Sequence, residues 1–238
     1  ITNEVYFVAQ KVMRFLGTNN VDNSARLCHS PSTAGLKSTV GVAATTCSYR
    51  DWFESDLIVF LGSNPANDQP VAMKYLYKAK KAGTKVVVVN SYREPGMERY
   101  WVPSNLESAV FGTRIADRFF MINVGGDIGF LNGTFRYMVE RGWVDRDFVA
   151  DHTTGLDEAT AAITAVPWEE LEAVAGTPRA EMEAFARMVS EAKTAVFVWS
   201  MGITQHAFGE DNVRAIVNLA LTKGFVGRDK CGVMPIRG

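Results

Sequence analysis

Asp56-Leu57-Ile58-Val59-Phe60-Leu61-Gly62 is the stretch that decides the fold, because its apolar run is unbroken. A continuous run of this length is typical of a strand buried on both faces, whereas a half-exposed strand would alternate apolar and polar residues. An amphipathic helix over 70–82 and a second run, Lys85-Val86-Val87-Val88-Val89-Asn90, follow it. Strand, helix and strand in this order form a βαβ unit with parallel strands.

The same alternation continues toward the C-terminus, where strands separate helices and no repeat or linker divides the chain. The pattern predicts further strands at 118–124 and 194–199, and helices at 127–141, 156–164, 168–174, 178–191 and 207–223. We therefore expect an α/β protein with a doubly wound, mostly parallel sheet and helices on both faces.

Toward the N-terminus, Val5, Val8 and Val12 recur at helical spacing and predict a helix over 4–16. The polar residues 18–30 predict a partly exposed loop, and Pro31 suits the first turn of a helix over 31–40.

Composition excludes several classes of protein. The formal net charge is −1 and the basic residues are scattered, which argues against nucleic acid as a partner. The apolar runs are far shorter than a bilayer span, so no membrane insertion is expected. Three cysteines are too few for a disulfide framework and favour a reducing, cytoplasmic location. The absence of an initiator Met and the ending in a Gly/Pro-rich segment lead us to expect an internal fragment of a longer protein.

Polar residues gather in the segments that follow the expected strands, where ligands bind in parallel sheets. Each segment carries glycine, amide or hydroxyl groups, which suit a nucleotide-like ligand, although a single such loop is more often only a turn. The motifs that usually bind NAD and ATP are missing. The candidate ligand-binding residues are Gly62, Asn64, Asn67, Asn90, Arg93, Gly126, Asp127, Met201, Gly202 and Gln205.

If the strands are parallel, Asn64, Asn90, Gly126 and Gln205 should emerge at one edge of the sheet and converge on one crevice. A strand running the other way would separate them.

Cys28 and His29 are the most reactive-looking pair in the chain, because a thiolate is a nucleophile and soft metal ligand and imidazole accepts protons near neutral pH. A single cysteine is more often a small buried apolar group, which is our interpretation of Cys47 and Cys231. His152 and His206 have no partner at zinc-ligand spacing and are taken as ordinary histidines.

Four segments in order resemble the molybdopterin-dependent oxidoreductases, and within them the formate-dehydrogenase-like alpha subunits. They are Asn19-Asn20-Val21-Asp22 with Ala25-Arg26-Leu27-Cys28-His29-Ser30-Pro31-Ser32, Gly62-Ser63-Asn64-Pro65, Trp199-Ser200-Met201-Gly202-Ile203-Thr204-Gln205, and Val233-Met234-Pro235-Ile236-Arg237-Gly238. The first is similar to the family's metal-ligand loop, and the next two are similar to its pterin-dinucleotide loops.

The resemblance implies a bis-molybdopterin guanine dinucleotide cofactor with molybdenum or tungsten. Cys28 would then be the metal ligand, His29 would take a proton from the substrate, and Arg237 would orient an anionic substrate. Residues 1–23 would be a helix and linker from a neighbouring domain, and residues 24–238 a Rossmann-like domain that binds the dinucleotide.

The resemblance also implies a small-molecule substrate, with formate as one candidate, and an electron-acceptor protein as partner. Asn90-Ser91-Tyr92-Arg93 departs from the Asp-Pro-Arg that formate dehydrogenases tend to have here. An iron–sulfur cluster would lie in a part of the protein outside this chain, and the fragment alone would be inactive. The alternative is a non-catalytic nucleotide-binding α/β module that retains the fold, with Cys28 inert.

Overall fold

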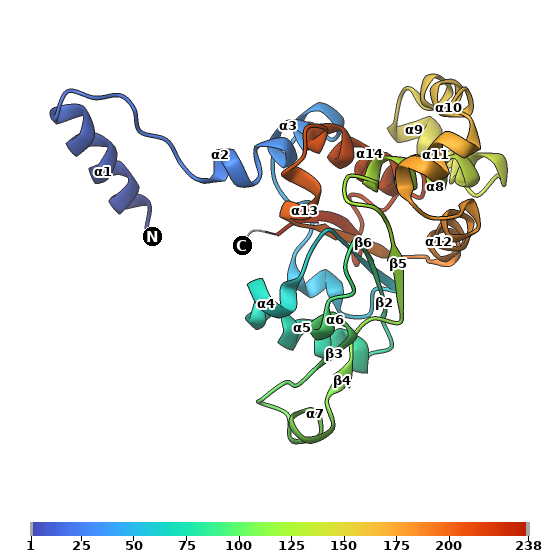
Figure 1. Ribbon diagram of the computed structural model, residues 1–238, viewed down its shortest axis with the longest axis horizontal. Coiled ribbons are helices and arrows are strands. Elements are labelled where there is room, and N and C mark those ends of the chain that lie inside the picture. The colour runs from blue at the N-terminus through green and yellow to red at the C-terminus, as the bar shows by residue number, and fades with distance from the viewer. Residues whose placement is uncertain (1, 237–238) are drawn as a thin grey trace.

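A parallel five-stranded sheet forms the centre of the computed structural model, which describes residues 2–236 (Figure 1). The strand order is β5-β2-β1-β6-β7, and every neighbouring pair is parallel. The strands are β1 (Leu57–Leu61), β2 (Lys85–Asn90), β5 (Arg118–Met121), β6 (Ala195–Trp199) and β7 (Gly232–Pro235).

Helices cover both faces of this sheet, as expected for a doubly wound fold. Ile58 and Phe60 of β1 point to one face, where they pack with Trp52 and with α5 (Pro70–Lys81). Val59 of β1 points to the other face, which α3 (Ser30–Thr39), α8 (Asp127–Glu140), α12 (Arg179–Glu191) and α14 (Gly209–Leu221) cover. Because both faces are covered, the strands are apolar throughout, which is why they were visible in the sequence.

The remaining helices are mostly short and lie at the periphery. They are α1 (Asn3–Phe15), α2 (Ala25–Cys28), the 3₁₀ helix η1 (Tyr49–Trp52), α4 (Pro65–Asp68), α6 (Pro95–Glu98), α7 (Leu106–Phe111), α9 (Arg146–His152), α10 (Leu156–Thr164), α11 (Trp168–Ala175) and α13 (Met201–Thr204).

Three elements differ from the sequence-based expectation. The loop expected over 18–30 contains the helical turn α2, so Cys28 ends a helix rather than lying in an irregular segment. Strand β7 was not predicted, because Gly232 and Pro235 hide its apolar residues from a run-based search; it forms by pairing with β6. A small antiparallel sheet of β3 (Arg99–Tyr100) and β4 (Thr113–Arg114) was also missed, because each strand has only two residues.

Helix α1 stands apart from the body of the molecule and is joined to it by an extended segment (Figure 1). None of its residues is buried, and Val5, Val8 and Phe15 are among its exposed apolar side chains. Within the described part of the chain, no helix has both the length and the apolar character needed to cross a membrane.

Candidate functional site

The carboxyl edge of the sheet carries the residues singled out from the sequence. Asn90 ends β2, while Asn64, Gly126 and Gln205 lie in the segments that follow β1, β5 and β6. Since all these strands are parallel, the four residues emerge at the same edge, as predicted.

At the centre of this edge, Gly62 and Gly202 bring the ends of the adjacent strands β1 and β6 into main-chain contact. The Gly202 amide donates to the Gly62 carbonyl oxygen at 3.0 Å. A Cβ atom on Gly202 would come within 2.6 Å of that oxygen, and one on Gly62 within 2.7 Å of the Gly202 carbonyl carbon. Only glycine fits at either position, so the sequence fixes a close approach between the two loops.

Buried polar atoms without a hydrogen-bond partner flank this contact. They are the hydroxyls of Ser63 and Ser200 and the amide oxygen Oδ1 of Asn64. Ser63 is 3% exposed and Ser200 is 2% exposed, so burial leaves both hydroxyls unsatisfied. Polar atoms without a hydrogen-bond partner, next to a main chain that carries no side chain at Gly62 and Gly202, suit a polar ligand that approaches the main chain closely.

Asn64 is fixed by its other amide atom, because Nδ2 donates to Glu94 Oε2 at 2.8 Å. Burial, and secondarily the charge of Asp68, raises the pKa of the Glu94 carboxyl. The bond joins the segment after β1 to the segment after β2.

Two hydrogen bonds tie the Cys28 turn to the same edge. Thr204 Oγ1 donates to the Cys28 carbonyl oxygen at 2.6 Å, and Gln205 Nε2 donates to the Leu27 carbonyl oxygen at 3.3 Å. Cys28 itself is partly exposed. The segment after β6 therefore contacts both Gly62 and the turn that presents the thiol.

His29 is buried behind Cys28 and takes part in a chain of side-chain hydrogen bonds. Its ring is 1% exposed, and Nδ1 lies 2.9 Å from Ser32 Oγ. The same hydroxyl oxygen accepts from Trp199 Nε1 at 2.9 Å. Because indole nitrogen only donates, the Ser32 hydroxyl keeps its own proton for His29 Nδ1. The last residue of β6 thus helps to orient the imidazole.

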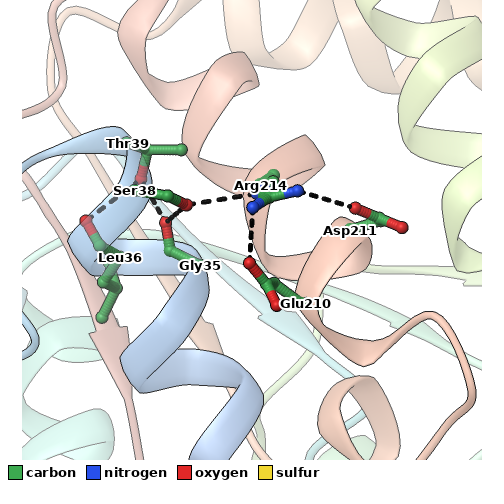
Figure 2. A network of polar contacts seen from close by, with 7 residues as sticks. All are labelled: Gly35, Leu36, Ser38, Thr39, Glu210, Asp211 and Arg214. Atoms are coloured by element: carbon green, nitrogen blue, oxygen red, sulfur yellow. Dashed lines mark hydrogen bonds and ion pairs between the residues drawn. The ribbon is translucent and has the colours of Figure 1, made fainter.

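A polar network holds α3, which follows His29, against α14 (Figure 2). Arg214 Nε donates to Ser38 Oγ at 3.1 Å, while its terminal nitrogens bind Glu210 and Asp211. Close backbone approach reinforces this contact, because a Cβ on Gly35 would lie 2.7 Å from Val213 Cγ1. The network fixes α3 and, through it, the position of His29.

Asp127 supplies a buried carboxyl group at the start of α8. It is 5% exposed, and burial raises its pKa to about 6, while the charge of His206 acts in the opposite direction. His206 Nε2 lies 2.7 Å from the Gly202 carbonyl oxygen. His206 therefore contacts the loop of the Gly62–Gly202 contact and acts electrostatically on Asp127.

Several predicted residues are not gathered at this centre. Arg93 points away from it, with its guanidinium 5.0 Å from the Phe119 ring centroid. Asn67 is exposed, and Asn90 Oδ1 accepts from the neighbouring Ser91 amide at 2.9 Å. Gly126 packs against carbonyl oxygens of α11, which explains its lack of a side chain without a ligand. Met201 is half-buried in α13, and Arg237 lies outside the described residues.

Sequence reasoning missed Ser32, Ser63, Ser200 and His206 as members of the site. Serines after strands are too common to be singled out, and only burial without a partner distinguishes Ser63 and Ser200. Among residues 2–236, no three His, Cys, Asp or Glu side chains lie close enough to hold a metal ion. A metal at Cys28 would need most of its ligands from a bound group.

Comparison with known proteins gives matches along the whole chain. The family model described as molybdopterin oxidoreductase matches residues 1–237. Formate dehydrogenase H of Escherichia coli strain K12 is 34% identical over 237 residues, covering 99% of this chain and 31% of that protein. Protein YdeP of the same strain is 30% identical over 249 residues, covering 100% of this chain and 33% of YdeP.

Among solved structures, acetylene hydratase from Pelobacter acetylenicus has the same fold, with a TM-score of 0.75 and 19% identity. The alignment covers 95% of this chain and 28% of the hydratase. The chain thus spans about a third of the length of the curated relatives named above.

Proposed function

This chain belongs to the molybdopterin oxidoreductase family, and we propose that it forms the part of a larger oxidoreductase that holds one half of a bis-molybdopterin guanine dinucleotide. The bound molybdenum or tungsten would accept two electrons from a small substrate, and the protein would supply position and electrostatics.

One observation carries the proposal: the Gly62–Gly202 contact lies beside unsatisfied buried hydroxyls, and Thr204, two residues after Gly202, donates a hydrogen bond to the Cys28 turn. The glycines leave the main chain open to close approach, and Ser63, Ser200 and Asn64 offer polar atoms to a dinucleotide. The donor set and the cradle therefore fit such a group, and the cofactor roles of Gly62, Asn64, Met201, Gly202 and Gln205 rest on this geometry.

Asn67, Asn90, Gly126 and Asp127 complete the proposed cofactor-binding set, because they lie in segments at the same edge. Asp127 would supply a carboxyl group to donors of the ligand. Arg93 is the weakest member, since its guanidinium faces Phe119 and Glu98 rather than the glycine contact.

Cys28 is the proposed protein ligand of the metal, and its partial exposure leaves the thiol accessible from outside the domain. His29 is the proposed proton acceptor, held by Ser32, and Arg237 the proposed anchor for an anionic substrate. Formate is the first substrate to test, because formate dehydrogenase H is among the relatives. Acceptor protein, iron–sulfur cluster and cytoplasmic location are further parts of this proposal.

Metal and nucleotide analysis of the full-length protein tests the function. We expect near-stoichiometric molybdenum or tungsten, guanosine monophosphate released by acid hydrolysis, and loss of activity in Cys28→Ser. The control is Cys47→Ala, because that thiol lies beside Gly232, at the start of β7 and so at the end of the strand opposite the carboxyl edge. A folded full-length protein without metal or nucleotide would establish the non-catalytic module instead.

The domain boundary is a further part of the proposal. Helix α1 exposes its apolar residues, and the relatives are about three times longer, so we assign residues 1–23 to an interface with the rest of the polypeptide. The backbone amides of α1 should be protected from hydrogen exchange in the full-length protein. The 238-residue chain alone should show no protection there and no activity, because it supplies only one side of the cofactor site.

A further inference from the structure

A pocket on the side of the sheet, along the edge strand β5, is lined by four arginines. Its volume is about 860 Å³, within the usual range for small-molecule sites. One wall is the edge strand β5, and the other is the β3–β4 pair, which projects from the body with α7 (Figure 1). Arg118 of β5 pairs with Val87, in the middle of β2, so the pocket runs along the flank of the sheet. We call it the arginine pocket.

Two of the four arginines already have acidic partners. Arg118 Nη2 binds both carboxylate oxygens of Glu181, at 3.0 and 2.9 Å. Arg93 lies 3.7 Å from Glu98 and stacks over Phe119. These two ion pairs offset the charges of Arg118 and Arg93.

The other two arginines, Arg99 and Arg114, have no carboxylate partner among residues 2–236. Arg99 Nη1 donates to the Phe111 carbonyl oxygen at 2.8 Å. Arg114 donates through Nε to Ala116 O at 3.1 Å and through Nη2 to Asp117 O at 3.0 Å. Both guanidinium groups are therefore held in place by neutral acceptors, and both keep a full positive charge.

Apart from Glu98, the acidic side chain in the lining is that of Asp117, which already has other partners. Asp117 Oδ2 accepts from Lys80 Nζ at 2.6 Å and from the Val86 amide at 2.7 Å. It therefore neutralises Lys80 rather than Arg114.

Arg99 and Arg114 are also direct partners across the β3–β4 pair. Like charges directly opposite each other in an antiparallel pair are destabilising. An anion bound by both guanidiniums would turn this repulsion into attraction, and arginine suits that task because its planar fork matches the oxygens of phosphate. The aromatic ring of Trp101, 52% exposed, lies in the same lining and offers a flat apolar surface.

We propose that the arginine pocket binds an organic phosphate, with Arg99 and Arg114 on the phosphate and Trp101 against the organic part. Two uncompensated cations match the charge of a phosphate monoester, which is between −1.5 and −2 near neutral pH by rough estimate. The volume exceeds what inorganic phosphate fills, so an organic group is part of the ligand. Arg93 is the one lining residue that the proposed cofactor set also includes, and the proposed phosphate contacts of Arg99 and Arg114 lie outside that set.

Phenyl phosphate is the probe, titrated into the full-length, cofactor-loaded protein and followed by calorimetry and tryptophan fluorescence. We expect saturable binding that weakens at least about tenfold in Arg99→Gln and in Arg114→Gln, as for loss of one charge-assisted hydrogen bond. The matched control is Arg141→Gln, which removes an exposed arginine paired with Glu183 on α12. Metal content should not change in any variant.

Other probes give the results that would overturn the proposal. Benzoate, a monoanion of similar shape, should bind much more weakly than phenyl phosphate, and hexaglutamate should not compete. A phosphate site would be refuted if phenyl phosphate did not bind saturably, or if the glutamine variants bound it as tightly as the wild type. It would also be refuted if hexaglutamate bound more tightly than phenyl phosphate. If either glutamine variant fails to fold, Arg99→Lys and Arg114→Lys keep the charge, and weaker binding by them supports the forked contact.

Discussion

The amide of Gly202 donates a 3.0 Å hydrogen bond to the carbonyl oxygen of Gly62, so the loops after β1 and β6 touch through their main chains. Neither loop can carry a side chain at this point without moving the other. The contact sets the floor of the proposed cofactor site, because the unsatisfied hydroxyls of Ser63 and Ser200 lie beside it.

Replacing Gly202 with Ala should separate these loops. A Cβ atom would lie 2.6 Å from the Gly62 carbonyl oxygen, which is backbone and cannot rotate away. We expect destabilisation of about 1–3 kcal/mol, typical of overpacking, and loss of nucleotide from the full-length protein. Chemical unfolding and nucleotide release measure the two effects. Ala207→Ser, an exposed change just beyond the loop, should alter neither; an unchanged nucleotide content in Gly202→Ala would refute the role of this contact.

Removing the Ser32 hydroxyl should destabilise the protein through Trp199. In Ser32→Ala the buried indole N–H loses its acceptor, which costs about 1–3 kcal/mol. Trp199→Phe removes the donor, so the double variant should be less destabilised than the sum of the single variants. A double-mutant cycle from urea unfolding measures the coupling, and strict additivity would show that the hydrogen bond contributes nothing.

Asp127 should make stability depend on pH. Its folded pKa is raised from 3.8 to about 6, so its contribution is fully present below the unfolded pKa and is lost as pH rises through about 6. Between acidic and neutral pH, the free energy of unfolding of the wild type should therefore fall by on the order of 2–3 kcal/mol relative to that of Asp127→Asn.

Urea unfolding of both proteins at pH 3.5 and 7.5 checks this expectation for Asp127. The exposed carboxylate of Asp151 provides the control, since Asp151→Asn should show no comparable change. A difference between wild type and Asp127→Asn that stays constant with pH would contradict burial of the charged group.

Gly35→Ala should destabilise the protein although it replaces glycine in a helix. Alanine normally stabilises a helix interior by about 1 kcal/mol relative to glycine. Here the new Cβ would lie 2.7 Å from Val213 Cγ1 and push α3 away from α14. Val213→Ala in the same chain should restore only part of the stability, because it removes Cγ1 but leaves the Cβ of residue 213 at 2.8 Å from the new atom. Thermal unfolding compares the variants, and a higher melting temperature for Gly35→Ala alone would show that the helices are not closely packed.

Arg214→Gln should have a much smaller effect than Gly35→Ala. The side chain of Arg214 is 43% exposed, and partly exposed ion pairs contribute about 0–1 kcal/mol. The network in Figure 2 therefore orients α3 more than it stabilises it. Urea unfolding in low and high salt measures how much the ion pairs of Arg214 contribute to the free energy of unfolding. If Arg214→Gln lowered this free energy as much as Gly35→Ala does, the expected order of the two effects would be wrong.

The sequence by itself determined four of the five strands of the parallel sheet, its main helices and the edge at which Asn64, Asn90, Gly126 and Gln205 lie. Apolar periodicity is local, so the runs at 57–61 and 85–90 were visible without knowledge of their neighbours. The rule that parallel strands end at one edge then placed the residues that follow them. Strands β3, β4 and β7 were not predicted, because strands of two to four residues are too short to show a periodic pattern of apolar residues.

Only the tertiary structure decided which side chains meet. Ser32 lies between His29 and Trp199, and His206 lies near Asp127, because α3, β6 and α8 converge in packing. Packing also places the Arg93 guanidinium over the Phe119 ring, and strand pairing places Arg99 opposite Arg114. Proximity between distant residues, and the burial that leaves a hydroxyl unsatisfied or raises the pKa of a carboxyl, are properties of the packed chain. No local pattern of residues along the sequence predicts such proximity or burial.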